Sequence, residues 1–377
     1  MTVDDRGQMR ILLVTADTSF ADDRSECLVA DLVRGLPPAG LDVALACPES
    51  SLTQVASAAG VRIFPIELAS GLATTRASAL RRIIAGFKPD IVHAHGPRAA
   101  MVARLADSRA RRRVVYTVRD LHVHHVAPRA KRAAFLRVEH RLRARTAAWV
   151  CECGSDCDLA ERLKILRRER SHVVYKGVEL PQLPSSGVRH AVDVPLVLSI
   201  GVFNEQKDQR TLLDAWASAR SSAPDAVLAL VGSGEFEPRL RERVFALGIG
   251  ESVRFLAPRP DVASLYAEAE LFVLSSRWEG LPYVLLQAMA HNLPVVSTAI
   301  DGIPELVINE DTGLLVPAHD PGSLAWAMRE LLTDPDRRRA MGEAGRIRIE
   351  RHFTLDEMIE STVRVYGDVL SAGEARD

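Results

Sequence analysis

The chain has 377 residues, enough for two domains of ordinary size, and its 47% hydrophobic and 26% charged residues are typical of a soluble globular protein. The formal net charge of −1 argues against a nucleic-acid-binding protein. The N-terminal residues are acidic without an apolar core, and no uninterrupted apolar run reaches the roughly 20 residues of a transmembrane helix. We therefore expect a cytoplasmic protein with neither a signal peptide nor a membrane span.

In the first half of the chain, short apolar segments alternate with segments of helical periodicity. Helices are expected at 26–36 and 77–87. Strands are expected at 10–14, 43–47, 61–65, 91–94, 113–118 and 148–151. Continuous apolar strands that alternate with helices are typical of a parallel sheet covered on both faces.

A stretch rich in Pro, Ser and Gly at 181–192 interrupts this alternation, which then starts again. Strands are expected at 195–200, 226–231, 253–256, 271–274, 295–297 and 313–316. Helices are expected at 209–219, 237–247, 262–269, 282–291 and 323–332, with a last amphipathic helix at 355–370. We predict an α/β protein of two Rossmann-like domains, 1–183 and 194–354, with 355–377 packing back toward the N-terminal domain. In such sheets ligands bind at the carboxyl ends of the strands.

The chain has five cysteines, three of which, Cys151, Cys153 and Cys157, lie close together. They could form a metal site or redox pair, or simply be the end of a buried strand followed by a helix start. The structural interpretation is favoured, because no second cluster of Cys or His completes a zinc site at the usual spacing. Nothing indicates a disulfide framework, which fits a reducing cytoplasm.

Positive charge is concentrated at 98–170, which hold 19 Lys and Arg against 8 Asp and Glu. This excess is consistent with a solvated helix face. It is also consistent with a surface that meets anionic lipid or an anionic acceptor. Aromatic residues are sparse in this region, which disfavours nucleic acid.

Two glycine-containing loops follow expected strands of the second domain. Gly201 is followed by Lys207, whose flexible ammonium group suits a phosphate ligand, although most lysines are only surface residues. Gly232, Ser233 and Gly234 follow the next strand, and glycines allow a ligand to approach the backbone closely. An ordinary strand–helix turn would have the same pattern.

The segment 275–290 reads as a strand end, a polar loop with Glu279, and a helix in which Pro282 takes the first position. Such a helix start favours an anion, and its backbone N–H groups would face phosphates. The N–H groups concerned belong to Gly280, Leu281 and Tyr283. Eight helical positions from Glu279 to Gln287 would span about 12 Å, the reach from a sugar across a diphosphate to a ribose. Alternatively, Glu279 only stabilises the helix dipole and Gln287 is an exposed helix residue.

The segments with Gly201 and Lys207, with Gly232 to Gly234 and with Glu279 resemble, in this order along the chain, the motifs of glycosyltransferase family 4. The resemblance extends to 302–305 and 312–317, and in the first half to 89–96 and 176–178. It implies a GT-B fold with two parallel sheets facing across a cleft, a nucleotide-sugar donor, retention of configuration and no metal cofactor. It also implies that Glu279 holds the donor sugar, Lys207 the diphosphate and Gln287 the ribose, with the base near Arg259.

The chain differs from the family pattern at several positions. The glycine pair before the first helix is Asp23 and Arg24, and the arginine after Gly201 is Val202. The loop histidine near the reacting sugar is Arg119, the asparagine before Gly177 is Lys176, and the second glutamate of the donor motif is Gln287. Losing the arginine removes a phosphate contact of about 1.5–3 kcal/mol, and the neutral Gln287 costs about 1 kcal/mol. Arg119 and Lys176 could return positive charge to the site.

Catalysis is assigned to Glu279, Lys207 and Arg119. The acceptor side is assigned to Asp23, Arg24, His95, His122 and His124, for which a metal role is disfavoured.

We predict a retaining glycosyltransferase that moves a sugar from a nucleotide-sugar donor, by expectation a UDP-sugar, to a glycan or lipid-linked acceptor. The expected setting is cell-surface polysaccharide biosynthesis in the cytoplasm, peripheral at the inner membrane face. The alternative is a catalytically impaired, transferase-like binding or scaffold subunit, because five site positions are altered. A nucleotide-sugar epimerase fits the Glu279 segment less well.

Overall fold

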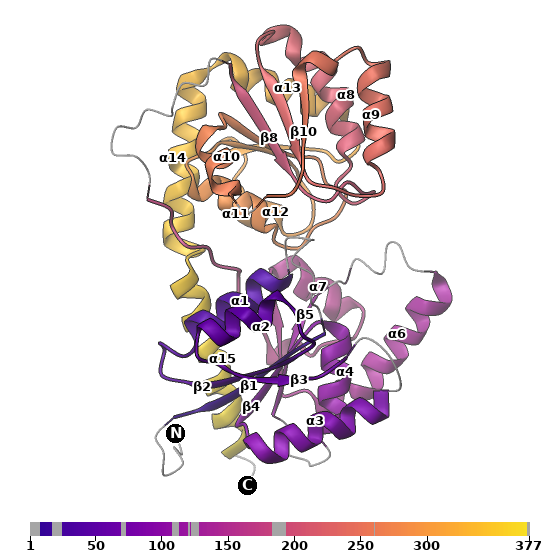
Figure 1. Ribbon diagram of the computed structural model, residues 1–377, viewed down its shortest axis with the longest axis vertical. Coiled ribbons are helices and arrows are strands. Elements are labelled where there is room, and N and C mark those ends of the chain that lie inside the picture. The colour runs from indigo at the N-terminus through magenta and orange to yellow at the C-terminus, as the bar shows by residue number, and fades with distance from the viewer. Residues whose placement is uncertain are drawn as a thin grey trace. The chain divides into compact units, whose positions relative to one another are not determined.

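The computed structural model describes residues 8–16, 25–68, 73–107, 113–119, 121, 128–182, 194–259 and 261–374. The chain forms two compact units, one of Met1–Lys176 with Leu355–Asp377 and the other of Gly177–Thr354 (Figure 1). The second unit begins at Gly177, ahead of the 183–193 stretch, because residues between 177 and 182 are hydrogen-bonded to the rest of that unit. The Val178 N–H donates to the Phe353 carbonyl at 2.9 Å, and Arg346 Nη1 donates to the Pro181 carbonyl at 3.1 Å.

The first unit has a seven-stranded parallel sheet of order β3-β2-β1-β4-β5-β6-β7. Its strands are β1 (Arg10–Thr15), β2 (Asp42–Cys47), β3 (Arg62–Pro65), β4 (Ile91–His95), β5 (Val114–Val118), β6 (Ala148–Cys151) and β7 (Ser171–Val173). Its helices are α1 (Ser25–Gly35), α2 (Ser51–Ala58), α3 (Ala73–Phe87), α4 (Gly96–Ala106), α6 (Arg129–Leu142), α7 (Gly154–Arg162) and α15 (Leu355–Glu374).

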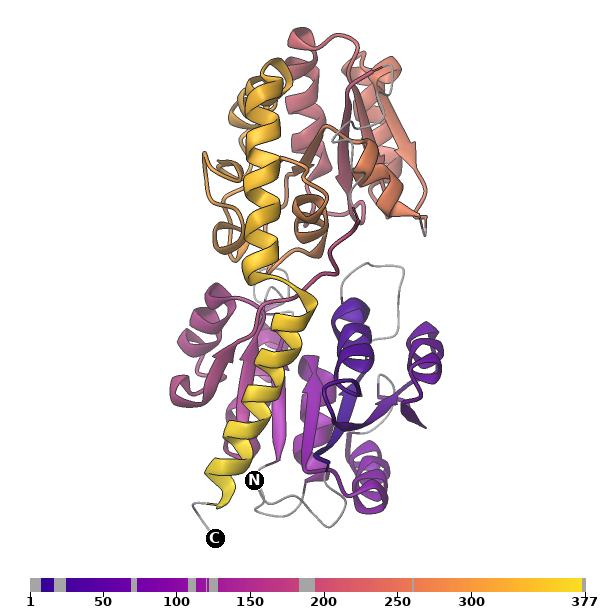
Figure 2. The same cartoon turned by 90° about the vertical axis from the view of Figure 1, so that its left-hand side faces the viewer.

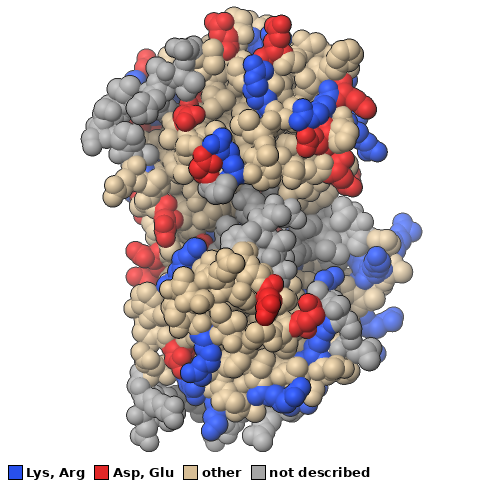
Figure 3. All heavy atoms as spheres, in the orientation of Figure 1, with Lys and Arg blue, Asp and Glu red and all other residues tan. Residues whose placement is uncertain are grey.

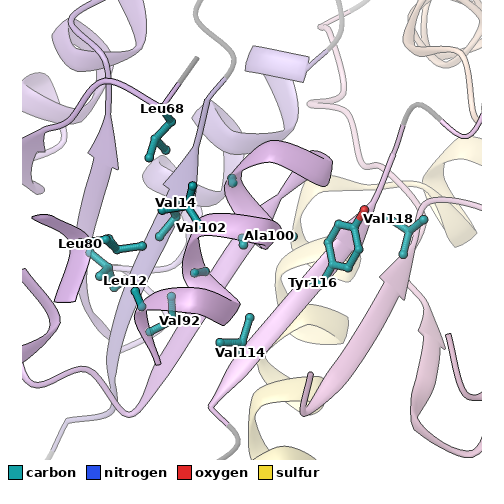
Figure 4. Close-up of a cluster of buried hydrophobic side chains, with 14 of the residues drawn as sticks. Leu12, Val14, Leu68, Leu80, Val92, Ala100, Val102, Val114, Tyr116 and Val118 are labelled. Atoms are coloured by element: carbon teal, nitrogen blue, oxygen red, sulfur yellow. The ribbon is translucent and has the colours of Figure 1, made fainter. Parts of the chain in front are cut away.

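Alternating residues of the central strands supply the two faces of this sheet. Leu12 and Val14 pack with residues of α3 and α4, as the close-up in Figure 4 shows. Ile11 and Leu13 pack on the other face with residues of α1, α2 and α15. Both faces are therefore covered, which explains why the strands are apolar without interruption.

Helix α15 is an integral part of the first unit although it comes from the far end of the chain. Figure 2 shows it, in yellow, lying along the strands of this unit. Its Met358 and Tyr366 are buried in the same core as the β1 side chains. Helix α1 approaches it so closely that a Cβ on Gly35 would lie 2.6 Å from the Ile359 side chain.

The second unit has a six-stranded parallel sheet of order β10-β9-β8-β11-β12-β13. Its strands are β8 (Leu196–Ile200), β9 (Val227–Val231), β10 (Val253–Leu256), β11 (Leu271–Leu274), β12 (Val295–Thr298) and β13 (Gly313–Val316). Its helices are α8 (Gln209–Ala219), α9 (Glu237–Ala246), α10 (Val262–Glu268), α11 (Tyr283–Ala290), α12 (Ile303–Leu306), α13 (Pro321–Thr333) and α14 (Pro335–His352). The two parallel α/β sheets confirm the predicted fold class.

Candidate functional site

In the second unit, two loops lie side by side at the carboxyl ends of β8 and β9. The strands are in register with Ile200 opposite Val231, and the Gly201 N–H continues the ladder to the Val231 carbonyl at 3.0 Å. Beyond it, the Phe203 N–H donates to the Ser233 carbonyl at 2.9 Å. The loop that leads to Lys207 is thus tied to the Gly232–Gly234 loop.

The glycines of these loops are required by the packing of one loop on the other. A Cβ on Gly232 would lie 2.1 Å from the Gly201 carbonyl oxygen, and one on Gly234 would lie 2.4 Å from the Phe203 carbonyl oxygen. A Cβ on Gly201 would meet the Lys207 side chain at 3.2 Å. The sequence interpretation assigned these glycines to approach of a ligand, whereas the structure shows that neighbouring backbone and the Lys207 side chain already fill the space. The Ser233 side chain, by contrast, is exposed.

Lys207 and Glu279 form a buried ion pair at this edge of the sheet. Lys207 Nζ donates to Glu279 Oε1, and Ser276 Oγ donates to the same oxygen at 2.8 Å. The two residues are only 2% and 6% exposed. Behind them, Ser275 Oγ donates to the Lys207 carbonyl at 2.9 Å. Sequence reasoning predicted both residues, and the structure brings them together.

Sequence reasoning missed Asp301, which fixes the backbone of Glu279. The Glu279 N–H donates to Asp301 Oδ2 at 2.9 Å. Asp301 has φ of 42°, in the left-handed region where few residues other than glycine and Asn or Asp are found. Its position directly before the Gly302–Glu305 segment is the one signal that could have drawn attention to it.

The helix that follows Glu279 begins one residue later than predicted. Pro282 has ψ of 120°, which is extended, so it is the N-cap of α11 and not its first helical residue. Glu279 to Pro282 form a loop, and only the last four of the eight steps to Gln287 are helical. The assumption of eight helical positions was therefore wrong, because the helical part contributes only about 6 Å and the rest of the span from Glu279 to Gln287 belongs to the loop.

Within α11, Tyr283 and Gln287 are the two half-buried residues and all others are buried. They are four positions apart and therefore share one face of the helix. Gly280 is also half-buried, whereas Leu281 is buried. The partial exposure of Gln287 leaves both of its sequence-based interpretations open.

Arg259, expected near the nucleotide base, is exposed and forms an ion pair with Asp261. Its Nε donates to Asp261 Oδ1 at 2.6 Å. Val202, which replaces the expected arginine, is half-buried, and its carbonyl accepts a hydrogen bond from Gln209 Nε2 at 2.9 Å. The uncharged Val202 side chain therefore cannot make the phosphate contact expected of an arginine at this position.

In the first unit, Arg119 and Lys176 both bind Glu152, a residue that sequence reasoning missed. Arg119 Nε lies 3.1 Å from Glu152 Oε1, and Lys176 Nζ lies 2.7 Å from Oε2. Burial acts to raise the pKa of Glu152, but the charges of Lys176 and Arg119 and the Lys176 hydrogen bond outweigh it and lower that pKa. Only the structure could reveal this role, because the three residues belong to loops after different strands.

His93 and His95, both on β4, have different environments. His93 Nδ1 shares a 2.7 Å hydrogen bond with the Tyr366 hydroxyl, and its Nε2 shares one of 2.7 Å with Thr117 Oγ1. Both ring nitrogens of the buried His95, in contrast, lack a hydrogen-bond partner in the described part of the chain. Burial lowers the pKa of His93 to about 3. Burial, and then the nearby His93 and Arg119, hold the pKa of His95 well below its ordinary value.

Four further predicted acceptor-side residues lie outside the described residues. They are Asp23, Arg24, His122 and His124.

The clustered cysteines occupy the positions expected of a strand end and a helix start. Cys151 ends β6 and Cys157 lies in α7, and both are buried, as are Cys47 and Cys153. Within the residues that the structure describes, no three His, Cys, Asp or Glu side chains are grouped so that they could hold a metal ion. No helix among those described is both long enough and apolar enough to span a membrane.

Two family models match the chain. Residues 26–182 match the model described as Glycosyltransferase Family 4, and residues 186–348 match the model described as Glycosyl transferases group 1.

Curated relatives carry glycosyltransferase names. A D-inositol 3-phosphate glycosyltransferase of Salinispora tropica is 34% identical over 55% of this chain and 48% of its own length. A GDP-mannose-dependent phosphatidylinositol monomannoside mannosyltransferase of Mycolicibacterium smegmatis is 34% identical over 44% of each chain. The chain thus spans about half the length of these relatives.

Solved structures show the same fold. The HepE protein of Anabaena in complex with UDP has a TM-score of 0.83 at 19% identity, covering 96% of this chain and 100% of that chain. A glycosyltransferase of Rickettsia africae has a TM-score of 0.80 at 17% identity, covering 96% and 99%. The two family models, which together match residues 26–182 and 186–348, show that the chain belongs to glycosyltransferase family 4, and the solved structures show that it has the GT-B fold.

Proposed function

We propose that this protein moves a sugar from a nucleotide-sugar donor to an acceptor with retention of configuration. The observation that carries the proposal is the buried pair of Lys207 and Glu279 at the carboxyl edge of the second sheet. This pair places a cation suited to a diphosphate next to a carboxylate that can accept hydrogen bonds from sugar hydroxyls. Membership of family 4 supports the assignment.

In this proposal Lys207 stabilises the charge that develops on the departing nucleoside diphosphate. Its ammonium group is held in place by the contact with Glu279 and by the packing of its side chain against Gly201. A preorganised cation in a site of low exposure stabilises such a charge more than one in water. The N-terminus of α11 adds a positive partial charge at the same edge.

Glu279 orients the donor sugar in this proposal. Its carboxylate accepts hydrogen bonds from Lys207 and Ser276, and its N–H is bound by Asp301. A carboxylate fixed in this way needs little reorganisation when the sugar binds. Gln287, on the half-buried face of α11, would accept a hydrogen bond from a ribose hydroxyl.

We assign acceptance of the acceptor's proton to an oxygen of the departing phosphate. The two carboxylates assigned to the site are engaged, Glu279 by Lys207 and Asp301 by the Glu279 N–H. Retention is tested by the anomeric configuration of the product in NMR spectra. An inverted product would contradict this assignment.

UDP is the expected nucleotide, and the solved Anabaena protein is a complex with UDP. A relative with a GDP-mannose-dependent name makes GDP the main competitor. The test is calorimetry with UDP-, GDP- and ADP-sugars, followed by an assay for released nucleoside diphosphate with polyol phosphates and lipid-linked glycans as acceptors. We expect turnover to persist in EDTA. The absence of both donor binding and turnover would favour the alternative, a transferase-like scaffold subunit.

We further propose that helix α6 brings the protein to an anionic membrane surface where cell-surface polysaccharide is assembled. Its basic side chains are exposed, and Figure 3 shows Lys and Arg gathered over this part of the first unit. They are Arg129, Lys131, Arg132, Arg137 and Arg141. The one acidic residue of α6, Glu139, is buried and bound by Arg104 at 2.8 Å, so it does not offset them at the surface. Failure to sediment with anionic vesicles at low salt would contradict this part of the proposal.

A further inference from the structure

Four side chains gather at the carboxyl edge of the first sheet: His95, Arg119, Glu152 and Lys176, which we call the first-unit cluster. They follow four neighbouring strands, β4 to β7, whose ends are aligned. The aligned pairs are His95 with Thr117, Val118 with Cys151, and Cys151 with Val173. Since the strands are parallel, the residues that end or follow them emerge at the same edge.

The charged members of the cluster are ordered around one carboxylate. Glu152 lies 3.1 Å from Arg119 Nε and 2.7 Å from Lys176 Nζ, and all three side chains are less than a tenth exposed. Two cations therefore converge on one anion in this described set. A second, external oxyanion can approach the same two cations and balance the remaining positive charge of this described set.

His95 supplies the second observation. It is 3% exposed, and neither of its ring nitrogens has a hydrogen-bond partner among the described residues. Its neighbour His93, whose ring is tilted by 35° with the ring centroids 4.2 Å apart, has both nitrogens bound by protein groups. A neutral imidazole offers one donor and one acceptor, and a buried polar group left unbound costs free energy. A ligand hydroxyl can satisfy either nitrogen.

We infer that the first-unit cluster binds an acceptor that carries an oxyanion, phosphate or carboxylate, beside a hydroxyl group. The oxyanion accepts hydrogen bonds from Arg119 and Lys176, and the hydroxyl binds His95. Glu152 holds the two cations in place and limits the affinity by competing for them. The inference rests on the proposed transferase function, because it names the class of acceptor.

The test is calorimetric titration of the full chain with glycerol 3-phosphate and with glycerate, with glycerol as the neutral control. We expect both oxyanions to bind and glycerol not to bind. Binding of only one names the charged group, phosphate or carboxylate, that the cluster prefers. Binding of neither, or equal binding of glycerol, would overturn the inference.

Variants locate the site. Arg119→Gln and Lys176→Gln should each weaken oxyanion binding by about tenfold or more, the loss expected for one charge-assisted hydrogen bond. Glu152→Gln should tighten it severalfold, a gain that partial unfolding cannot produce. Arg82→Ala, at an exposed arginine on α3, is the matched control and should change nothing. Unchanged binding in the Arg119 and Lys176 variants would contradict the inference.

Two comparisons separate this site from the donor site. His95→Leu should weaken glycerol 3-phosphate but leave sulfate unchanged, because sulfate carries no hydroxyl group at neutral pH. Saturating UDP should leave oxyanion binding unchanged, and competition would instead place the oxyanion at the donor phosphate site. A chain that binds the oxyanion but neither UDP nor any nucleotide sugar would retain the oxyanion site at the first-unit cluster, but the proposed transfer reaction and the role of this ligand as its acceptor would be lost.

Discussion

Replacing Lys207 with methionine should destabilise the second unit, because it leaves the Glu279 carboxylate buried opposite an apolar side chain. Lys207 and Glu279 are 2% and 6% exposed, so water cannot take the place of the ammonium group. Removing one partner of a buried ion pair costs about 3–5 kcal/mol. Ser276 still donates to Glu279 Oε1 in this variant, so we expect a loss of about 3 kcal/mol.

The double variant Lys207→Met with Glu279→Gln should recover much of this loss, because it leaves no buried charge. Urea unfolding of the parent, both single variants and the double variant gives the coupling between the two positions. Arg241→Met is the matched control, since Arg241 pairs with Glu237 on the exposed side of α9 at 2.8 Å. It should cause no measurable change.

The same variant tests the role of Lys207 toward the donor. A charge-assisted phosphate contact of about 1.5–3 kcal/mol corresponds to a loss of UDP affinity of about 10- to 100-fold. Glu279→Gln should leave UDP affinity intact but weaken binding of the UDP-sugar, because Glu279 is placed on the sugar. A Lys207→Met protein that unfolds at the parent's urea concentration and binds UDP as tightly would refute this reasoning.

Three further predictions concern the glycine loop, Asp301 and pH. Gly232→Ala should lower the free energy of unfolding by about 3 kcal/mol, since the new Cβ would lie 2.1 Å from the Gly201 carbonyl oxygen. Gly250→Ala is the control, because a Cβ there meets nothing within 4 Å. Equal urea midpoints for the two variants would contradict this prediction. Asp301→Gly should reduce donor affinity severalfold, because it frees the Glu279 N–H. Asp301→Asn keeps a side-chain oxygen that can accept this hydrogen bond, so it should not reduce donor affinity. Identical calorimetric affinities of the two variants would count against a positioning role of Asp301. Between pH 6.5 and about 3 the unfolded chain protonates His93 and the folded chain does not, so His93 should contribute a fall of about 1.4 kcal/mol per pH unit to the free energy of unfolding, in addition to the fall from His95, whose pKa is also lowered. His93→Gln should make the slope shallower by about that amount in urea melts, and an unchanged slope would refute the assignment.

Most of the strands that the sequence predicts are buried, and β3 (Arg62–Pro65), which is half-buried or exposed, was predicted from its apolar residues. Strand β7 (Ser171–Val173) was not among them, because its residues are half-buried or exposed and it has no apolar run. Helix α14 also lacks the usual signal. It packs through Met341, Gly342, Gly345 and Ile349, and a Cβ on Gly342 would lie 2.1 Å from the Asn292 carbonyl. Because two of these buried residues are glycines, the sequence of α14 lacks the hydrophobic periodicity from which a helix is predicted.

The donor-side residues could be predicted because they belong to local motifs directly after strands. Lys207 and Glu279 each stand in such a loop, and the sheet order places their loops next to each other. Asp301 and Glu152 could not be predicted in the same way. Each acts on a residue from a loop after another strand, and no spacing in the sequence reports that contact.

Taken singly, Arg119 and Lys176 are two departures from the family pattern in separate segments. The structure shows that they are coupled, because both bind the same buried carboxylate of Glu152. Removing either cation would leave Glu152 with less compensation, which is costly for a buried charge. The two substitutions are therefore best understood as one change in the charge of the first unit. Lys207 does not share in that change, since it has its own counterion in Glu279.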